Sequence, residues 1–287
     1  MTGTLLSFGH GYSARALARR LLPQGWSVIG TTRTQEKAEL LRADGVEAVV
    51  WPGSDLTAHL SRATHILISA GPDENGDPVL AELSRQIAGI AGQLEWAGYL
   101  STTGVYGDHQ GGWVDETTPL TPSTRRGRFR VMAEGQWQDL AQETGLPLHI
   151  FRLAGIYGPK RGPFAKVRNG TARRIIKKGQ VFSRIHVEDI AQVLEASIRA
   201  PRPGAIYNLC DDLAAPPEDV IGYAAELLGL PVPPSVAFEE AEMTPMARSF
   251  YAESKRVRND LLKSELGVTL KYPDYHTGLQ ALLRDED

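Results

Sequence analysis

Two arginines in the segment 125-RRGRFRVMAE-134 have the types and spacing to do chemistry. Arg126 and Arg130 are four residues apart at the start of a predicted helix, so both can reach the same side of it. A guanidinium group stays protonated in proteins and is not a general base, but it stabilises an oxyanion or grips a phosphate or carboxylate. The pair therefore predicts an anion-stabilising site, and the alternative is two surface arginines without a task.

The sequence 9-GHGYSA-14 has the pattern of a dinucleotide-binding turn. Gly9 and Gly11 allow a tight turn and a close approach of the backbone to a pyrophosphate. Tyr12 and Ser13 lie where the following helix begins, and the free N–H groups there favour a phosphate. The motif follows one predicted strand and precedes a helix and a second strand, which favours a cofactor site over a purely structural glycine turn.

The second predicted strand ends in 30-GTTR-33, and this ending bears on the choice of cofactor. An NAD site usually has an acid here that accepts from the ribose 2′-hydroxyl, whereas this chain has none until Glu36. Arg33 could instead pair with a 2′-phosphate. We therefore expect NADP, with NAD possible if Arg33 is an exposed arginine without a role.

Charge is distributed unevenly along the chain. Residues 160–184 include nine Lys or Arg and no Asp or Glu, although the formal net charge of the protein is −3. Such a segment can attract an anion, and the alternative is a solvated basic surface. Only Phe164 and Phe182 interleave the basic residues, and single-strand readers need stacking aromatics, so we expect no nucleic-acid partner.

Buried apolar runs alternate with helical segments in the first half of the chain. The expected strands cover 4–9, 26–30, 46–51, 64–70, 96–101 and 147–154, and the expected helices cover 12–23, 35–43, 78–94 and 129–144. This alternation predicts an α/β fold with a doubly wound parallel sheet, a Rossmann fold.

The pattern loosens beyond about residue 155. One strand-like run remains, 205–209, with helices near 187–199, 216–229, 254–266 and 274–284. We expect residues 1–155 to form the dinucleotide-binding domain. Residues 156–287 would form a smaller, mostly helical substrate portion, with the 184–210 region returning to the sheet.

Composition sets further bounds. The 287 residues are 42% hydrophobic, which is enough for a proper core. The first residues show no secretion signal, and no run approaches the roughly 20 apolar residues of a membrane helix, so no membrane partner is expected. A single cysteine, Cys210, cannot form an internal disulfide, which makes a reducing cytoplasm the simplest compartment. The sequence has no His and Cys cluster for a metal, and no metal is expected.

Six further motifs occur in an order and spacing that together are quite specific. They are 54-SDL-56, 69-SAGP-72, 101-STTGVYGD-108, 115-DETTPLTP-122, 152-RLAGIYGP-159 and 184-RIHVEDIA-191. With the glycine motif, they make most of the chain resemble an atypical extended short-chain dehydrogenase of the NAD-dependent epimerase/dehydratase family.

The resemblance implies roles for several of these residues. Asp55 and Leu56 would lie against the adenine of the cofactor, and Ala70 and Gly71 would line the cofactor after the fourth strand. Thr102 would donate a hydrogen bond to the reacting oxygen. Relatives of this kind are commonly dimers through the helices after the fourth and fifth strands, so a homodimer is possible.

The chain departs from the family at its reactive residues. The family's Tyr and Lys, in a Y-x-x-x-K motif, fall on Arg126 and Arg130, and an Asn that helps hold nucleotide sugars is replaced by Gly155. A phenol with a pKa of about 10 can exchange a proton with an alcohol or a carbonyl, but a guanidinium cannot. Any proton must then come from water, from the substrate or from Tyr106, the nearest plausible phenol in the sequence, unless Tyr106 only packs as an aromatic.

Two functional hypotheses follow. The first is an NADP-dependent oxidoreductase or epimerase-like enzyme acting on a small anionic or sugar-nucleotide-like substrate. Arg161 and Arg184 are its expected substrate ligands, because both adjoin family-like motifs. The second is a non-catalytic NAD(P)H-binding sensor or regulatory protein.

Overall fold

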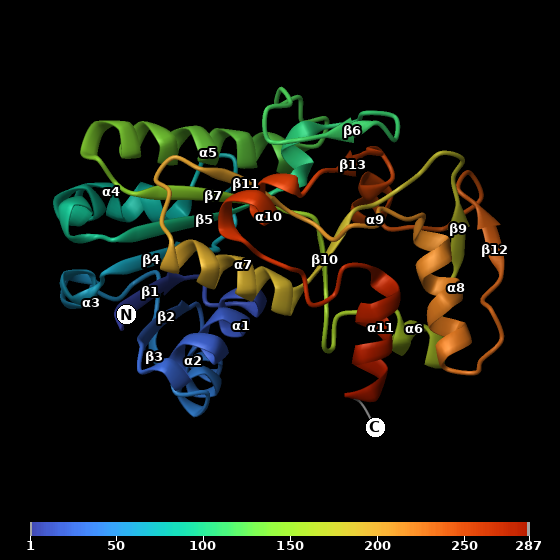
Figure 1. Ribbon diagram of the computed structural model, residues 1–287, viewed down its shortest axis with the longest axis horizontal. Helices are drawn as coiled ribbons and strands as arrows, with labels where there is room; N and C mark the ends of the chain where they lie inside the picture. Colours follow the sequence, from blue (N-terminus) through green and yellow to red (C-terminus); the bar gives the residue numbers. More distant parts are fainter. Residues whose placement is uncertain (1, 286–287) are drawn as a thin grey trace.

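The computed structural model describes residues 2–285, and its main layer is a parallel sheet of seven strands (Figure 1). Across the sheet the order is β11 (Ile206–Leu209), β7 (Leu148–Leu153), β5 (Trp96–Thr102), β4 (His65–Ile68), β1 (Thr4–Phe8), β2 (Ser27–Thr32) and β3 (Glu47–Val50). All neighbouring strands run parallel. The chain leaves β1 towards β2 and β3, then returns to β4 on the other side. The switch point of this topology, where α/β proteins bind ligands, therefore lies at the carboxyl ends of β1 and β4. The predicted doubly wound sheet is confirmed.

Helices cover both faces of the sheet, as Figure 1 shows for α4 and α5 on one side and α1 and α7 on the other. One face carries α1 (Tyr12–Leu21), α2 (Gln35–Ala43), α7 (Val187–Arg199) and α10 (Asp260–Leu266). The opposite face carries α3 (Thr57–Arg62), α4 (Pro78–Ile90) and α5 (Arg125–Thr144). Short 3-10 turns follow three elements: η1 (Leu22–Gln24), η2 (Ala91–Gln93) and η3 (Thr103–Tyr106).

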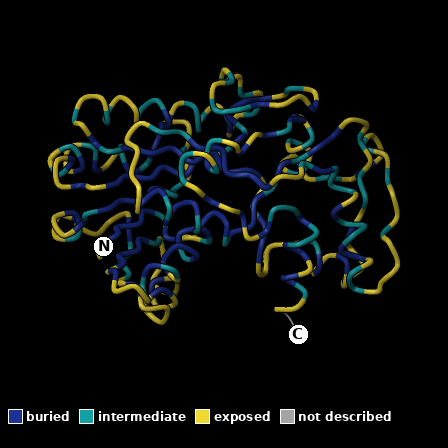
Figure 2. Tube along the Cα trace, in the orientation of Figure 1, coloured by how far each residue is buried: buried dark blue, intermediate teal, exposed yellow. Residues whose placement is uncertain are grey.

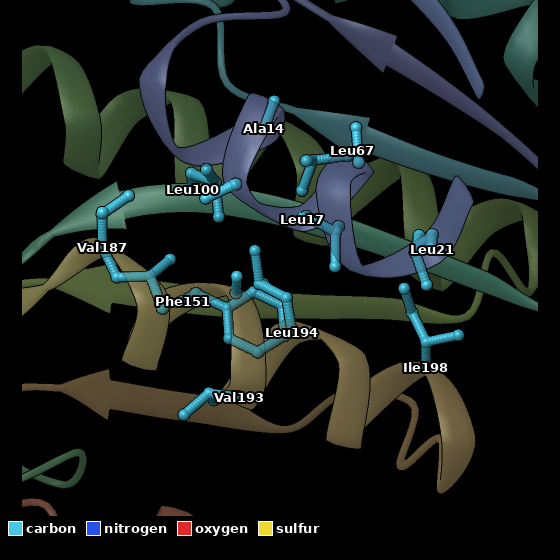
Figure 3. Close-up of a cluster of buried hydrophobic side chains, with 14 of the residues drawn as sticks. Ala14, Leu17, Leu21, Leu67, Leu100, Phe151, Val187, Val193, Leu194 and Ile198 are labelled. Carbon is cyan, nitrogen blue, oxygen red and sulfur yellow. The ribbon is translucent and has the colours of Figure 1, made fainter. Parts of the chain in front are cut away.

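Apolar side chains join α1 to α7 on one face of the sheet (Figure 3). Leu17 and Leu21 from α1 lie in one cluster with Leu194 and Ile198 from α7 and Phe151 from β7, and all five are buried. Burying a side chain of this size contributes roughly 1.5–3 kcal/mol. This packing holds α7, late in the sequence, against α1, the helix that follows the first glycine-rich turn of the chain. Figure 2 shows that the chain is buried along the central strands and more exposed along the outer helices and turns.

A smaller lobe lies beyond the carboxyl ends of the strands, at the right of Figure 1. Its helices are α6 (Phe164–Arg168), α8 (Pro217–Leu227), α9 (Pro245–Phe250) and α11 (Tyr275–Arg284). Three short parallel pairs tie the loops together: β8 (Gly155–Tyr157) with β10 (Arg184–His186), β9 (Arg174–Ile176) with β12 (Ser235–Ala237), and β6 (Trp113–Val114) with β13 (Arg256–Val257). The lobe has its own apolar cluster between α6, α8 and α11.

Two predictions for the second half were wrong. The expected helix over 254–266 is a two-residue strand, β13, followed by α10, and the region after residue 155 has several short strands besides the predicted one. Strands of two or three residues are too short to show alternation, and tertiary pairing determines them. Helix α5 also begins four residues earlier than expected, because the Thr124 hydroxyl accepts a hydrogen bond from the Gly127 N–H at 3.1 Å and caps the helix.

No helix within residues 2–285 is both long enough and apolar enough to cross a membrane.

Candidate functional site

The turn after β1 has the geometry of a phosphate cradle. Gly9 has a φ of +73°, and a Cβ there would lie 3.0 Å from the main-chain nitrogen of Ala70. Only glycine lets the turns after β1 and β4 meet this closely. Gly11 precedes α1 without a side-chain cap, and the first turn of α1 has no acidic residue. The free N–H groups at this helix start therefore fit a pyrophosphate.

His10, which the sequence analysis did not single out, anchors this turn to β2. A Cβ on Gly30 would lie 2.8 Å from the His10 ring, so the ring packs directly over that glycine. The His10 N–H donates to the Thr31 carbonyl at 2.8 Å, and the Gly9 N–H donates to the Thr31 hydroxyl at 2.9 Å. Burial lowers the pKa of His10 to about 4, so the imidazole is neutral at neutral pH. A signal was present in the sequence, since a glycine inside a strand often marks a close approach.

Of the residues expected to contact the adenosine part of the cofactor, some are exposed and one is buried. Arg33 directly follows β2 and is exposed at the carboxyl edge of the sheet. The Asp55 carboxylate accepts hydrogen bonds from the Thr57 N–H at 2.9 Å and from the Thr57 hydroxyl at 2.6 Å, and these bonds lower its pKa. Leu56 is 1% exposed and belongs to the core, so its side chain does not offer the surface that an adenine contact would need.

Arg130 is fixed beside the turn after β4. Its Nη1 donates to the Tyr99 hydroxyl at 3.0 Å and to the Leu100 carbonyl at 2.7 Å, and its guanidinium lies over the Tyr99 ring. A Cβ on Gly71 would lie 3.9 Å from its Nη2. The structure therefore places a permanent positive charge between β5 and the residue expected to line the cofactor.

Thr102 and Arg126 lie on β5 and α5, the strand that Arg130 contacts and the helix to which it belongs. Thr102 ends β5, and its half-buried hydroxyl accepts from the Gly104 N–H at 3.2 Å. That bond leaves the hydroxyl proton free to donate to a ligand. Arg126 is exposed on the first turn of α5, one helical turn before Arg130.

The burial of Tyr106 argues against its expected role in proton transfer. Its side chain is 0% exposed, and its hydroxyl donates to Asn208 Oδ1 at 2.7 Å. The same oxygen accepts from Arg152 Nη1 at 2.9 Å. Burial raises the pKa of Tyr106 to about 12. The phenol is therefore enclosed by protein partners and cannot reach a substrate, which corrects the expectation drawn from its nearness in sequence.

The two expected substrate arginines lie in different surroundings. The guanidinium of Arg161 lies 5.6 Å above the centre of the Tyr12 ring, next to the glycine turn. Arg184 donates from Nη1 to the Phe182 carbonyl at 2.8 Å and to the Ala215 carbonyl at 3.0 Å. Burial lowers the pKa of Arg184, and burial raises the pKa of its neighbour Asp211 to about 8. Arg184 thus links segments of the smaller lobe, and the structure does not place the two arginines at one shared anion site.

The smaller lobe also contains aromatic rings covered by cations, which the sequence analysis did not anticipate. Phe238 and Tyr251 lie with ring centres 5.4 Å apart, and Phe182 meets Tyr251 edge-on at 5.7 Å. Arg248 and Lys177 both lie over the Phe238 ring, at 4.8 and 5.2 Å. The combination suits a flat, anionic ligand, although cation–π contacts also stabilise a protein surface by themselves.

Surface hollows of about 370 and 420 Å³ lie elsewhere. The first is bordered by the end of α5 and the entry to β11, and the second by the segment between α10 and α11. Neither is lined by the turns after β1, β4 or β5.

The switch point of the parallel sheet and the glycine turn before an uncapped helix are features of the dinucleotide-binding α/β folds. The chain belongs to the NAD dependent epimerase/dehydratase family, whose model matches residues 8–210.

Three individual proteins are similar to this chain over almost its whole length. Protein YeeZ of Escherichia coli (strain K12) is 30% identical over 279 residues, which cover 93% of this chain and 95% of YeeZ. A functionally unknown conserved protein from Silicibacter pomeroyi DSS is 65% identical and superposes with a TM-score of 0.95 over 99% of both chains. UDP-glucuronic acid 4-epimerase from Bacillus cereus, in complex with UDP-glucuronic acid and NAD, is 14% identical with a TM-score of 0.80, covering 99% of this chain and 100% of the epimerase. At that identity the epimerase shows a shared fold.

Proposed function

We propose that the protein is an NADP-dependent oxidoreductase or epimerase-like enzyme that acts on a small anionic or sugar-nucleotide-like substrate. The observation that carries this proposal is the position of Arg130, a fixed cation between Tyr99 and Gly71, beside an uncapped glycine turn that fits a pyrophosphate. These features are of use to a cofactor-binding protein, whereas core packing alone does not require a cation at this place.

The cofactor would be held by the main chain of the turn at Gly9 and Gly11 and by the N–H groups at Tyr12 and Ser13. Arg33 would pair with the 2′-phosphate of NADP, because it is exposed where β2 ends. The fold relatives include proteins in complex with NAD. NADP is thus our proposal for this chain, based on Arg33 and on the missing acid at the end of β2.

The protein's own residues would divide the work at the reacting centre. The Thr102 hydroxyl would donate to the reacting oxygen of the substrate, and Arg130 would hold positive charge next to it. Arg126 would orient an anionic group from the exposed turn above. When bound, the nicotinamide cofactor supplies hydride transfer. No guanidinium can exchange the proton, so the proton would come from water or from the substrate itself.

The substrate would lie between the sheet and the smaller lobe. We propose that the smaller lobe forms the substrate portion and that the aromatic rings of Phe182, Phe238 and Tyr251, with their cations, contact the substrate. This proposal agrees with the anionic sugar nucleotide in the complex of the Bacillus cereus epimerase.

The main alternative is a non-catalytic NAD(P)H-binding sensor. The enclosure of Tyr106 favours it, because the nearest phenol in sequence cannot replace the missing tyrosine of the family motif. Both functions need the cofactor turn, and they differ only in turnover.

One assay separates the two functions. Carbonyl compounds are incubated with NADPH, and nucleotide sugars with NADP⁺, in the presence of the parent protein, Thr102→Val or Arg130→Met. The enzyme proposal expects turnover that falls at least tenfold in each variant, since one oriented hydrogen-bond donor is worth roughly 10²–10³ in rate. Turnover that both variants leave unchanged would rule out this site. Tight NADPH binding without turnover on the whole panel would favour the sensor.

A further inference from the structure

The smaller lobe touches the cofactor turn at one clasp. The Tyr12 hydroxyl, on the first residue of α1, donates to the Pro159 carbonyl at 2.9 Å, across 147 residues of sequence. The Arg161 guanidinium lies over the ring of the same tyrosine, at 5.6 Å from its centre. We call Tyr12, Pro159 and Arg161 the clasp.

The backbone of the clasp is fixed from two sides. Gly158 and Arg161 exchange two main-chain hydrogen bonds, of 3.0 and 2.9 Å, which close a tight turn. Gly158 has a φ of +153°, and a Cβ there would lie 2.6 Å from the Tyr12 hydroxyl and 2.7 Å from Val187 Cγ1. The turn therefore rests against the starts of both α1 and α7, and a side chain at position 158 would push it away.

The turn carries two positive charges and lies against the start of α1. Lys160 and Arg161 are both exposed, and Arg161 lies over the ring of Tyr12, whose N–H is one of the uncapped donors of α1. A contact with the face of a ring does not use the five N–H donors of a guanidinium, so they are available to a ligand. Cations and free N–H groups thus come together at the place where a pyrophosphate fits.

We propose that Arg161, held by Tyr12, binds the pyrophosphate of the cofactor, so that the smaller lobe closes over the cofactor as well as over the substrate. This inference rests on the proposed cofactor binding. It reassigns Arg161, which the sequence analysis placed among the substrate ligands, to the cofactor.

The test measures binding, so it does not depend on knowing the substrate. Calorimetric titrations use NADPH, ADP-ribose and adenosine with the parent protein, Arg161→Met and Tyr12→Phe. Arg173→Met is the matched control, because Arg173 is another exposed arginine of the basic segment and donates to the nearby carbonyls of Gly170 and Ala172.

Arg161→Met should weaken NADPH and ADP-ribose about tenfold or more and leave adenosine unchanged, because adenosine lacks the pyrophosphate. Tyr12→Phe keeps the ring but loses the bond to Pro159, so it should weaken the same two ligands by less. Hydrogen exchange of residues 155–163 should slow when NADPH binds the parent and should slow less in Arg161→Met.

Two results overturn the proposal, and they are distinguishable. If the parent binds NADPH and ADP-ribose, and Arg161→Met binds them as tightly as Arg173→Met does, the clasp does not contact the pyrophosphate and cofactor binding stands. If the parent binds neither ligand, the proposed function fails together with the clasp.

Discussion

Arg152 on β7 and Glu134 on α5 form an ion pair inside the protein, with Nη2 2.8 Å from Oε2 and side-chain exposures of 4% and 1%. Glu134 also accepts a hydrogen bond from the hydroxyl of Ser101, the residue before Thr102, and Arg152 donates a hydrogen bond to the Tyr106 hydroxyl. The pair joins β7 to α5, and the bond from Ser101 to Glu134 adds the end of β5 to this connection. Together they hold Thr102 on β5 and Arg130 on α5 in a fixed relation to each other.

Breaking the ion pair between Arg152 and Glu134 should destabilise the folded protein. Glu134→Gln leaves Arg152 buried without a countercharge, and losing one partner of a buried pair costs roughly 3–5 kcal/mol. We expect a loss of this size in the free energy of unfolding, measured with urea. Glu143→Gln, which removes an exposed carboxylate from the same helix, should change it by less than about 0.5 kcal/mol. Equal effects of the two substitutions would contradict a structural role for the pair.

Removing the Tyr106 hydroxyl should affect stability and not proton transfer. Tyr106→Phe leaves Asn208 without its donor and Arg152 without one acceptor, so we expect a loss of roughly 1–3 kcal/mol in urea unfolding. Turnover per folded molecule and NADPH affinity should stay within about twofold of the parent. A large fall in turnover with unchanged folding would restore the role that Tyr106 was given from the sequence.

Acid should destabilise the protein through its buried histidines. Burial lowers the pKa of His10, His65, His149 and His186 to about 4 in the folded protein. The unfolded chain binds protons at these positions near pH 6.5, whereas the folded protein does so only near pH 4. The contribution of the neutral histidines to stability is therefore fully present above pH 6.5 and falls as the pH drops from 6.5 towards 4, by up to about 1.4 kcal/mol per pH unit for each histidine.

His65→Leu isolates one of these contributions, because His65 lies between Trp26 and Trp96, away from the glycine turn. Urea unfolding at pH 7.5, 6.5, 5.5 and 4.5 should give a shallower acid slope for this variant, by about one histidine's share. Burial raises the pKa of Asp211 to about 8, which acts in the opposite direction between pH 4 and 8, so parent and variant are compared at each pH. Parallel curves for the two proteins would show that His65 titrates normally.

The sheet could be predicted from the sequence because its strands are buried on both faces. Such strands appear in the sequence as continuous apolar runs. The glycine turn could also be predicted, because its glycines stand directly after a strand. The structure gives the reason for Gly9: it has a positive φ, and a side chain there would meet Ala70. The clasp and the enclosure of Tyr106 could not be predicted in this way. Both depend on contacts over more than one hundred residues, Tyr12 with Pro159 and Tyr106 with Asn208, and no local pattern records them.

The expected preference for NADPH provides the last prediction. Arg33 is exposed at the end of β2 and would form a charge-assisted bond with a 2′-phosphate, a contact worth roughly 1.5–3 kcal/mol. The parent should therefore bind NADPH about 10- to 150-fold more tightly than NADH in a tryptophan-fluorescence or calorimetric titration. Arg33→Ala should remove most of this difference by weakening NADPH alone. Lys37→Ala removes a neighbouring exposed cation from the first turn of α2. It should leave the preference nearly intact, because the preference comes from the specific contact of Arg33 with the 2′-phosphate and not from positive charge in general. Equal affinities of the parent for the two cofactors would exclude NADP specificity and direct attention to NAD, the cofactor in the complexes of the fold relatives.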